Sequence, residues 1–266
     1  MGGQGRIRVG IGGWNYEPWR ETFYPKSVAK KDELAYASTK VTAIEINSTF
    51  YRLQKPDVYA KWREATPDDF MFSLKAPRFV AQRRVLAEAG PHLQRFIDSG
   101  ITELGAKLGP LLWQLEPKHA FDADDMQRFL DLLPGAANGV RLRHAVEVRH
   151  ESFTTPRFLE ITHERAVTVV LEDDESYPGF ADATGRFIYA RLRRSVSSEP
   201  TGYPSSAIRD WSERARIWAT GAEPDDLPRV EKTKPAKAAP RDVFIYFING
   251  AKERAPAAAM SLIAAL

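Results

Sequence analysis

Hydrophobic and polar residues alternate in several short segments of the chain, and the polar positions become charged toward the end of each segment. In residues 43–47 the two isoleucines share one face of an expected strand, whereas Glu45 and Asn47 share the other. Residues 71–75 and 144–150 repeat this arrangement. A buried strand tolerates such charges only where its end meets water or a ligand. The pattern therefore predicts parallel strands whose carboxyl ends surround a polar pocket.

Strand and helix patterns alternate along the whole chain. Proline or aspartate marks the start of several helical segments, and glycine or proline follows their ends. The expected strands are residues 7–12, 43–47, 71–75, 111–115, 145–149, 167–173, 186–193 and 243–249. The expected helices are residues 32–39, 57–65, 87–99, 122–133, 156–165, 207–219 and 257–266.

This alternation predicts a single-domain α/β fold over residues 1–266, a (β/α)8 TIM-type barrel with parallel strands and helices outside. The alternative is a doubly wound open sheet. Residues 10–14 argue against that sheet, because Asn15 stands where the dinucleotide-binding fingerprint has its third glycine. Residues 221–240 are rich in Pro, Lys, Asp and Ala and are expected to form an exposed insertion before the last strand.

The composition narrows the class of protein and its environment. The chain has 266 residues and no cysteine, which excludes disulfides, thiolate metal sites and cysteine nucleophiles. Its first residues lack the apolar core of a signal peptide, and no apolar run has the length of a membrane helix. We therefore expect a cytoplasmic protein with no membrane partner. The net charge of +3 allows a polyanionic partner without indicating one, and the oligomeric state stays open.

Carboxylates at the predicted strand ends are the candidates for proton transfer. Glu45 and Glu147 are expected to act as catalytic acid and base at the barrel mouth, and Glu172 or Asp173 are weaker candidates. The alternative is that each carboxylate pairs with a cation such as Lys75 and only fills the barrel interior.

Metal chemistry is not favoured by the sequence. Only His150, of the five histidines, directly follows a predicted strand, and a zinc site needs several nitrogen or sulfur ligands. A Mg²⁺ or Mn²⁺ ion held by carboxylates is compatible with the pattern but is not expected. We therefore expect no metal ligands and no cofactor.

Several cationic residues share the rim of the predicted pocket, namely Lys75, Arg149, Arg191 and Arg193. Arginine presents forked donors that match phosphate or carboxylate, so we expect an anionic small molecule or a nucleic acid as the partner. The aromatic residues of the first two loops are compatible with stacking on a base or sugar ring, although such residues more often pack as a layer over the barrel. The alternative to substrate binding for His150 is a structural role, in which its side chain forms a hydrogen bond within the protein. The residues expected to bind substrate are Trp14, Asn47, Lys75, Gln114, Arg149, His150, Asp173, Arg191 and Asn249.

Five motifs make the chain resemble a known family. They are Gly10-Ile11-Gly12-Gly13-Trp14, Glu45-Ile46-Asn47-Ser48-Thr49-Phe50-Tyr51, Phe72-Ser73-Leu74-Lys75-Ala76-Pro77, Lys107-Leu108-Gly109-Pro110 and Glu147-Val148-Arg149-His150. In this order they are similar to the YecE-like family, also called domain of unknown function 72, over nearly the whole chain. The resemblance implies a (β/α)8 barrel with likeness to endonuclease-type barrels, but no settled substrate.

Two segments depart from what the resemblance implies. Relatives often have Arg-Leu-His-Gly where this chain has Arg191-Leu192-Arg193-Arg194. They also often end the eighth strand in Asn-Asn-Asp before a histidine, where this chain has Ile248-Asn249-Gly250-Ala251-Lys252. Two rim histidines and an acid are therefore missing here.

Three functions are compatible with these patterns. The first is an enzyme that acts on a phosphorylated or other anionic substrate, including a nucleotide or nucleic acid, by carboxylate acid–base chemistry. The second is a nucleic-acid-binding protein without turnover, which uses the basic rim and the aromatic loop. The third is a degenerate barrel that has lost its activity with the missing rim residues.

Overall fold

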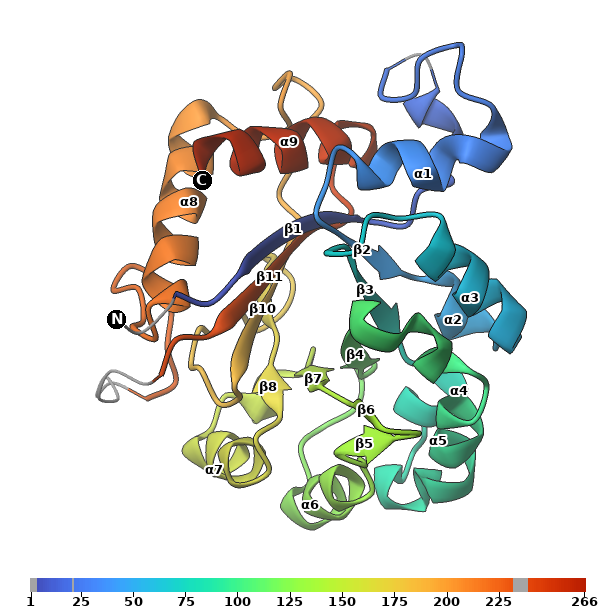
Figure 1. Ribbon diagram of the computed structural model, residues 1–266. Helices are drawn as coiled ribbons and strands as arrows, with labels where there is room; N and C mark the ends of the chain where they lie inside the picture. The colour runs from blue at the N-terminus through green and yellow to red at the C-terminus, as the bar shows by residue number, and fades with distance from the viewer. Residues whose placement is uncertain (1–3, 21, 232–238) are drawn as a thin grey trace.

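The computed structural model of the protein describes residues 4–20, 22–231 and 239–266. Helices lie around the outside of a central set of strands (Figure 1). The strands of the main sheet are β1 (Ile7–Gly12), β2 (Ala43–Ile46), β3 (Met71–Lys75), β4 (Leu108–Gln114), β7 (His144–Glu147), β8 (Thr168–Val169), β9 (Leu171–Asp173), β10 (Phe187–Leu192) and β11 (Asp242–Phe247). The α-helices are α1 (Glu33–Ser38), α2 (Ser48–Tyr51), α3 (Pro56–Glu64), α4 (Arg78–Ala81), α5 (Gly90–Ile97), α6 (Ala123–Asp131), α7 (Pro156–Glu164), α8 (Ser205–Ala219) and α9 (Ala255–Ala265).

The main sheet closes into a barrel. Within the described residues its strand order is β8-β7-β4-β3-β2-β1-β11-β10-β9, and every neighbouring pair is parallel. The first and last strands of this order, β8 and β9, are separated in sequence only by Val170. The Val170 N–H donates to the carbonyl of Val146. Strands β8 and β9 are two halves of the strand predicted at residues 167–173. The (β/α)8 barrel is therefore confirmed.

Strand parity separates the outer core from the barrel interior. Ile44 and Ile46 of β2 belong to the large apolar cluster under the helices, as the alternation predicts. The inner positions are apolar at the amino end and charged at the carboxyl end, so that Ala43 precedes Glu45 on β2. The apolar interior is formed by Ala43, Met71, Leu112, Ala145, Val170, Phe187, Tyr189, Phe244, Tyr246 and Ile248.

Two local features differ from the expected elements. Strand β4 begins three residues earlier than predicted, because the pairing with β3 shifts where Gly109 and Pro110 face Ser73 alone. The extra residue of a bulge is left out of the hydrogen-bond ladder, so the N–H that proline lacks is not needed there. The structure also has a hairpin that the sequence analysis missed, between β5 (Ala136–Ala137) and β6 (Val140–Arg141). Its turn residues, Asn138 and Gly139, both have positive φ, as such tight turns require.

The expected insertion is described only in part. Residues 232–238 lie outside the described residues. Within residues 221–231, buried and exposed positions are mixed, and the carboxylate of Glu223 pairs with Arg229 and, at 3.9 Å, with Arg241. No helix in the described part of the chain is long and apolar enough to cross a membrane.

Candidate functional site

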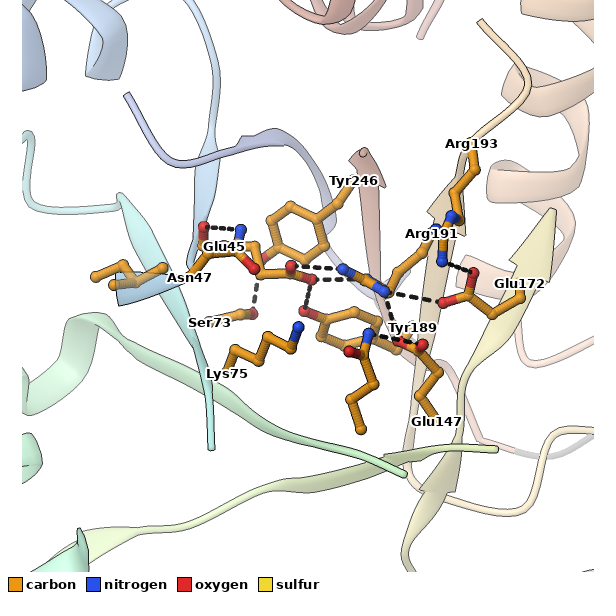
Figure 2. A network of polar contacts seen from close by, with 12 residues as sticks. Glu45, Asn47, Ser73, Lys75, Glu147, Glu172, Tyr189, Arg191, Arg193 and Tyr246 are labelled. Carbon is orange, nitrogen blue, oxygen red and sulfur yellow. Dashed lines mark hydrogen bonds and ion pairs between the residues drawn. The ribbon is translucent and has the colours of Figure 1, made fainter. Parts of the chain in front are cut away.

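Arg191 of β10 lies at the centre of a charged layer inside the barrel, and Figure 2 shows the carboxylates of Glu45, Glu147 and Glu172 around it. Its Nε and Nη2 each donate to Glu45 at 3.0 Å, and its Nη1 donates to Glu147 at 2.5 Å and to Glu172 at 3.0 Å. The hydroxyl of Tyr189 also donates to Glu45, at 2.7 Å. All these side chains are buried, with Glu45 and Glu147 fully covered. The internal ion pairing that the sequence left as an alternative is therefore present.

Two further arginines lie next to this layer. Each of them donates a hydrogen bond to one of its glutamates. Glu147 accepts hydrogen bonds from Arg149 Nε and from Gln114 Nε2, both at 2.7 Å. Glu172 accepts a hydrogen bond from Arg193 Nη1 at 3.2 Å. Arg149 and Arg193 each come two residues after an inward-facing residue of the same strand pattern. Their side chains therefore also face inward, closer to the barrel mouth.

Burial and charge separate the proton affinities of Glu147 and Glu172. Burial alone would raise the pKa of both carboxyl groups. For Glu147 the guanidiniums of Arg191 and Arg149 outweigh this effect and lower the pKa to about 2. For Glu172 burial and the adjacent charge of Glu147 raise the pKa to about 8. At neutral pH Glu172 is therefore protonated, and it does not cancel the charge of its arginine partners.

A cavity of about 400 Å³ opens at the carboxyl ends of the strands, above the charged layer. Its lining includes the predicted residues Asn47, Gln114 and Asn249. Among the residues that the structure describes, none of the lining side chains is a carboxylate. Five of the lining side chains are cationic, namely Lys75, Arg149, Arg191, Arg193 and Lys252.

Lys75 differs from the arginines because its amine has no hydrogen-bond or ion-pair partner in the described part of the chain. Its Nζ lies 3.9 Å from the centroid of the Phe50 ring. Burial and the nearby charge of Arg191 lower the pKa of Lys75 to about 8, although Glu45 and Glu147 act in the opposite direction. Lys75 therefore presents an amine that loses its proton close to neutral pH.

Three of the predicted binding residues do not line this cavity. The Trp14 ring packs edge-on against another tryptophan, on α3, at a centroid distance of 5.4 Å. The His150 side chain accepts the N–H of Ser152 at 3.2 Å and so caps a short 3-10 helix, which is its structural alternative. Asp173 directly follows the glutamate of the charged layer on β9, so its side chain points to the opposite side of the strand. Its carboxylate lies 3.7 Å from Arg194 and lines a separate cavity.

Two residues of the site were missed by the sequence analysis. Tyr189 shares the inward parity of Arg191, so the signal for it was present in the alternation of β10. Lys252 follows β11 in a 3-10 helix, Lys252–Arg254, where no strand periodicity indicates which way a side chain points. Its amine lies 4.5 Å from the centroid of the Tyr16 ring.

The three carboxylates of the charged layer are all bonded to one side chain. Glu45, Glu147 and Glu172 each lie 3.0 Å or less from a nitrogen of the Arg191 guanidinium. In residues 4–20, 22–231 and 239–266, no group of three or more His, Cys, Asp or Glu side chains is arranged to hold a metal.

Comparisons with known proteins agree on a family. The sequence profile of the family described as "Protein of unknown function DUF72" matches residues 8–266. The protein YecE of Escherichia coli K12 is 29% identical over 173 residues, which are 63% of this chain and 59% of YecE. The match thus spans less than two thirds of that relative's length.

Solved structures of DUF72 family proteins have a similar fold. One from Thermotoga maritima MSB8 has a TM-score of 0.71 and 20% identity, over 97% of this chain and 98% of its own. One from Enterococcus faecalis V583 has a TM-score of 0.71 and 16% identity, over 98% of this chain and 95% of its own. At these identities the likeness concerns the fold alone.

Proposed function

This chain belongs to the DUF72 family of proteins of unknown function, and we propose that it is an enzyme acting on a small phosphorylated or otherwise anionic substrate at the barrel mouth. One observation carries the proposal. The cavity there is lined by five cationic side chains, while the glutamates inside the barrel lie beneath it and are held by Arg191. A volume of about 400 Å³ is within the usual range for sites that bind small molecules.

The charges of the site favour a bound anion. Arg149 and Arg193 each give part of their guanidinium to a glutamate and leave other donors toward the cavity. Because Glu172 keeps its proton at neutral pH, the negative charge that faces Arg193 is that of Asp174, whose carboxylate lies 3.0 Å from Arg193 Nε. Lys75 and Lys252 have no carboxylate partner within the described residues. Phosphate or carboxylate oxygens would satisfy these donors.

The role of Glu45 and Glu147 in proton transfer stays a prediction. Neither carboxylate lines the cavity, and a general base works best with a pKa near the working pH. The pKa of Glu147, at about 2, is far from that range. We therefore assign both glutamates to positioning, in which they hold Arg191 and Arg149 toward the substrate.

Sulfate binding tests the anion site, because sulfate keeps its charge over the whole pH range used. We expect sulfate to raise the melting temperature more than chloride at equal ionic strength. Lys252→Met removes one cation without leaving a carboxylate unpaired, and it should weaken sulfate binding about tenfold. The matched control is Lys61→Met, which removes an exposed cation on α3 and should leave binding unchanged. The same stabilisation by sulfate and chloride would contradict the proposal.

The pH dependence of sulfate binding gives a second reading of the same site. Lys75 loses its proton and Glu172 becomes negative as the pH rises through about 8. Both changes remove positive charge from the region of the cavity, so sulfate affinity should fall over this range. Calorimetric titration at several pH values measures this fall, and a constant affinity would argue against binding beside Lys75.

A further inference from the structure

We propose that Lys75 is the nucleophilic amine of this site and forms an imine with the carbonyl group of a small substrate that also carries a phosphate or carboxylate. The inference rests on the proposed function, because the anionic group of the substrate would bind the cations and place the carbonyl beside Lys75. It adds the class of substrate, an anionic aldehyde or ketone, and the residue that reacts with it.

The position of the amine supports this role. Lys75 is the last residue of β3, and its side chain lines the cavity at the end of the barrel where TIM-barrel sites are formed. The Thr49 hydroxyl donates to the Lys75 carbonyl at 2.8 Å and so fixes the backbone at this point. The Phe50 ring covers one side of the amine, which leaves its remaining access through the cavity.

Burial of the amine keeps part of it unprotonated. Burial lowers the pKa of Lys75 most, Arg191 and Arg149 lower it further, and Glu45 and Glu147 raise it. At pH 7 an amine with a pKa of about 8 is unprotonated about 300 times more often than one near 10.5. Only the unprotonated amine attacks a carbonyl carbon, so this site has the form of nitrogen that imine formation needs.

The reaction needs no oxidant or reductant. The nitrogen lone pair of Lys75 forms a bond to the carbonyl carbon as the π bond between carbon and oxygen breaks, and one N–H proton passes from the nitrogen to that oxygen, which gives a carbinolamine. The carbinolamine then loses its hydroxyl group and the second N–H proton as one molecule of water, while the nitrogen lone pair forms the C=N bond. The net change converts an amine and a carbonyl into an imine and water.

Borohydride trapping with two aldehyde probes tests the inference. Pyridoxal 5′-phosphate carries a phosphate and an aldehyde, and pyridoxal carries the same aldehyde without phosphate. Each probe is mixed with the protein, the imine is reduced with borohydride, and modified lysines are located by peptide mass spectrometry. We expect the phosphate probe to modify Lys75 at least tenfold faster than pyridoxal does. Sulfate should suppress this reaction, and its rate should rise with pH through about 8.

Two variants keep the test decisive. Lys75→Arg keeps the positive charge but cannot form the imine, so it should retain the stabilisation by sulfate and lose the fast adduct. Lys118→Arg is the control, because Lys118 is exposed and paired only with Glu116 in the described structure, and Lys75 should react in it at the wild-type rate.

The outcomes separate this inference from the proposed function. Sulfate stabilisation with adducts spread over exposed lysines, or formed at Lys252 in place of Lys75, would overturn the imine role and leave the anion site in place. An adduct at Lys75 that sulfate does not suppress would also overturn it, because the anion and the carbonyl would not share a site. Absence of both sulfate stabilisation and the fast adduct would overturn both proposals.

Discussion

Arg191 is the residue on which the charged layer depends, because its guanidinium is the contact shared by all three buried glutamates. A charge inside a protein costs several kcal/mol unless opposite charges and hydrogen bonds compensate it. In this barrel the opposite charges come from Glu45 and Glu147, and the protonated Glu172 accepts a further hydrogen bond from Arg191 at 3.0 Å. The loss of one carboxylate from such a layer should therefore cost much more than the loss of one from an exposed pair.

The variant Glu45→Gln tests this difference. The amide keeps the shape of the carboxylate but removes the negative charge that faces Arg191 Nε and Nη2, so we expect a loss of about 3–5 kcal/mol in the free energy of unfolding. The control Glu160→Gln removes a carboxylate from the exposed pair with Arg157 and should change stability by less than about 0.5 kcal/mol. Urea denaturation measures both. A Glu45→Gln protein as stable as the wild type would favour the catalytic role predicted from the sequence.

The protonation of Glu172 should be visible in the pH dependence of stability. Its carboxyl group keeps a proton up to about pH 8 when folded, against 4.5 as its ordinary pKa. A raised carboxyl pKa contributes stability that is fully present below pH 4.5 and is lost as the pH rises to 8. Glutamine does not titrate, so the stability of Glu172→Gln relative to wild type should rise by about 1 kcal/mol per pH unit in this window. Parallel stability curves for the two proteins would contradict a protonated Glu172.

The sequence predicts which of these side chains face inward, but not which ones bond. Alternation alone places Glu45, Glu147, Lys75 and Arg191 on the interior side of their strands. The contact between Arg191 and Glu45 joins residues 146 positions apart across the barrel, and strand parity carries no information about such a distance. For this reason the sequence could not choose between proton transfer and internal ion pairing.

Among the strands, β1 shows how small residues shape the site. Its inward positions beyond Arg8 are Gly10 and Gly12, so this wall of the barrel carries no side chain there. A Cβ on Gly12 would lie 2.9 Å from Ile248 and 3.2 Å from the Asn47 amide nitrogen, at the edge of the cavity. The absence of side chains at Gly10 and Gly12 thus leaves space that residues of neighbouring strands and the cavity occupy.

The variant Gly10→Ala tests this close packing. The new Cβ would lie 2.2 Å from the Ala43 carbonyl oxygen and 2.9 Å from the Tyr246 ring, so the strands must move apart. We expect a loss of about 1–3 kcal/mol in the free energy of unfolding, the usual cost of overpacking. Gly135→Ala is the matched control, since a Cβ there meets nothing within 4 Å, and it should be neutral or slightly stabilising. Equal stability of the two variants would show that the barrel accepts the methyl group.

Element boundaries were predicted well where the hydrophobic period was long and less well where local geometry decided. Asp122 caps α6 through a 2.9 Å hydrogen bond from the Asp125 N–H, as the sequence predicts. The start of β4 was not predicted because Pro110 lies near it. Proline argues against a strand unless a bulge makes its missing N–H harmless. The Asn138-Gly139 hairpin had a recognisable turn signal between strands too short to show alternation.

The whole barrel concentrates cations at one end of its strands although the chain is almost neutral. The net charge is +3, and the cavity alone has five cationic lining residues. One of them, Arg193, stands where the resemblance of the sequence to the YecE-like family implies a histidine. Another, Lys252, lies in the segment after the eighth strand that departs from this resemblance. The departures expected to remove activity therefore coincide with groups that favour an anion.

A nucleic acid remains the alternative partner, and salt distinguishes it from a small anion. A protein that neutralises several phosphates along a strand loses affinity by orders of magnitude between about 50 and 200 mM salt, because each contact releases counterions. An anion held in a partly buried cavity is screened much less. We expect sulfate affinity to fall only about threefold over this range. A fluorescent single-stranded oligonucleotide of about 20 nucleotides should bind weakly at the lower salt and not measurably at the higher, by anisotropy. Tight oligonucleotide binding at the higher salt that Lys252→Met weakens would instead assign this mouth to nucleic acid.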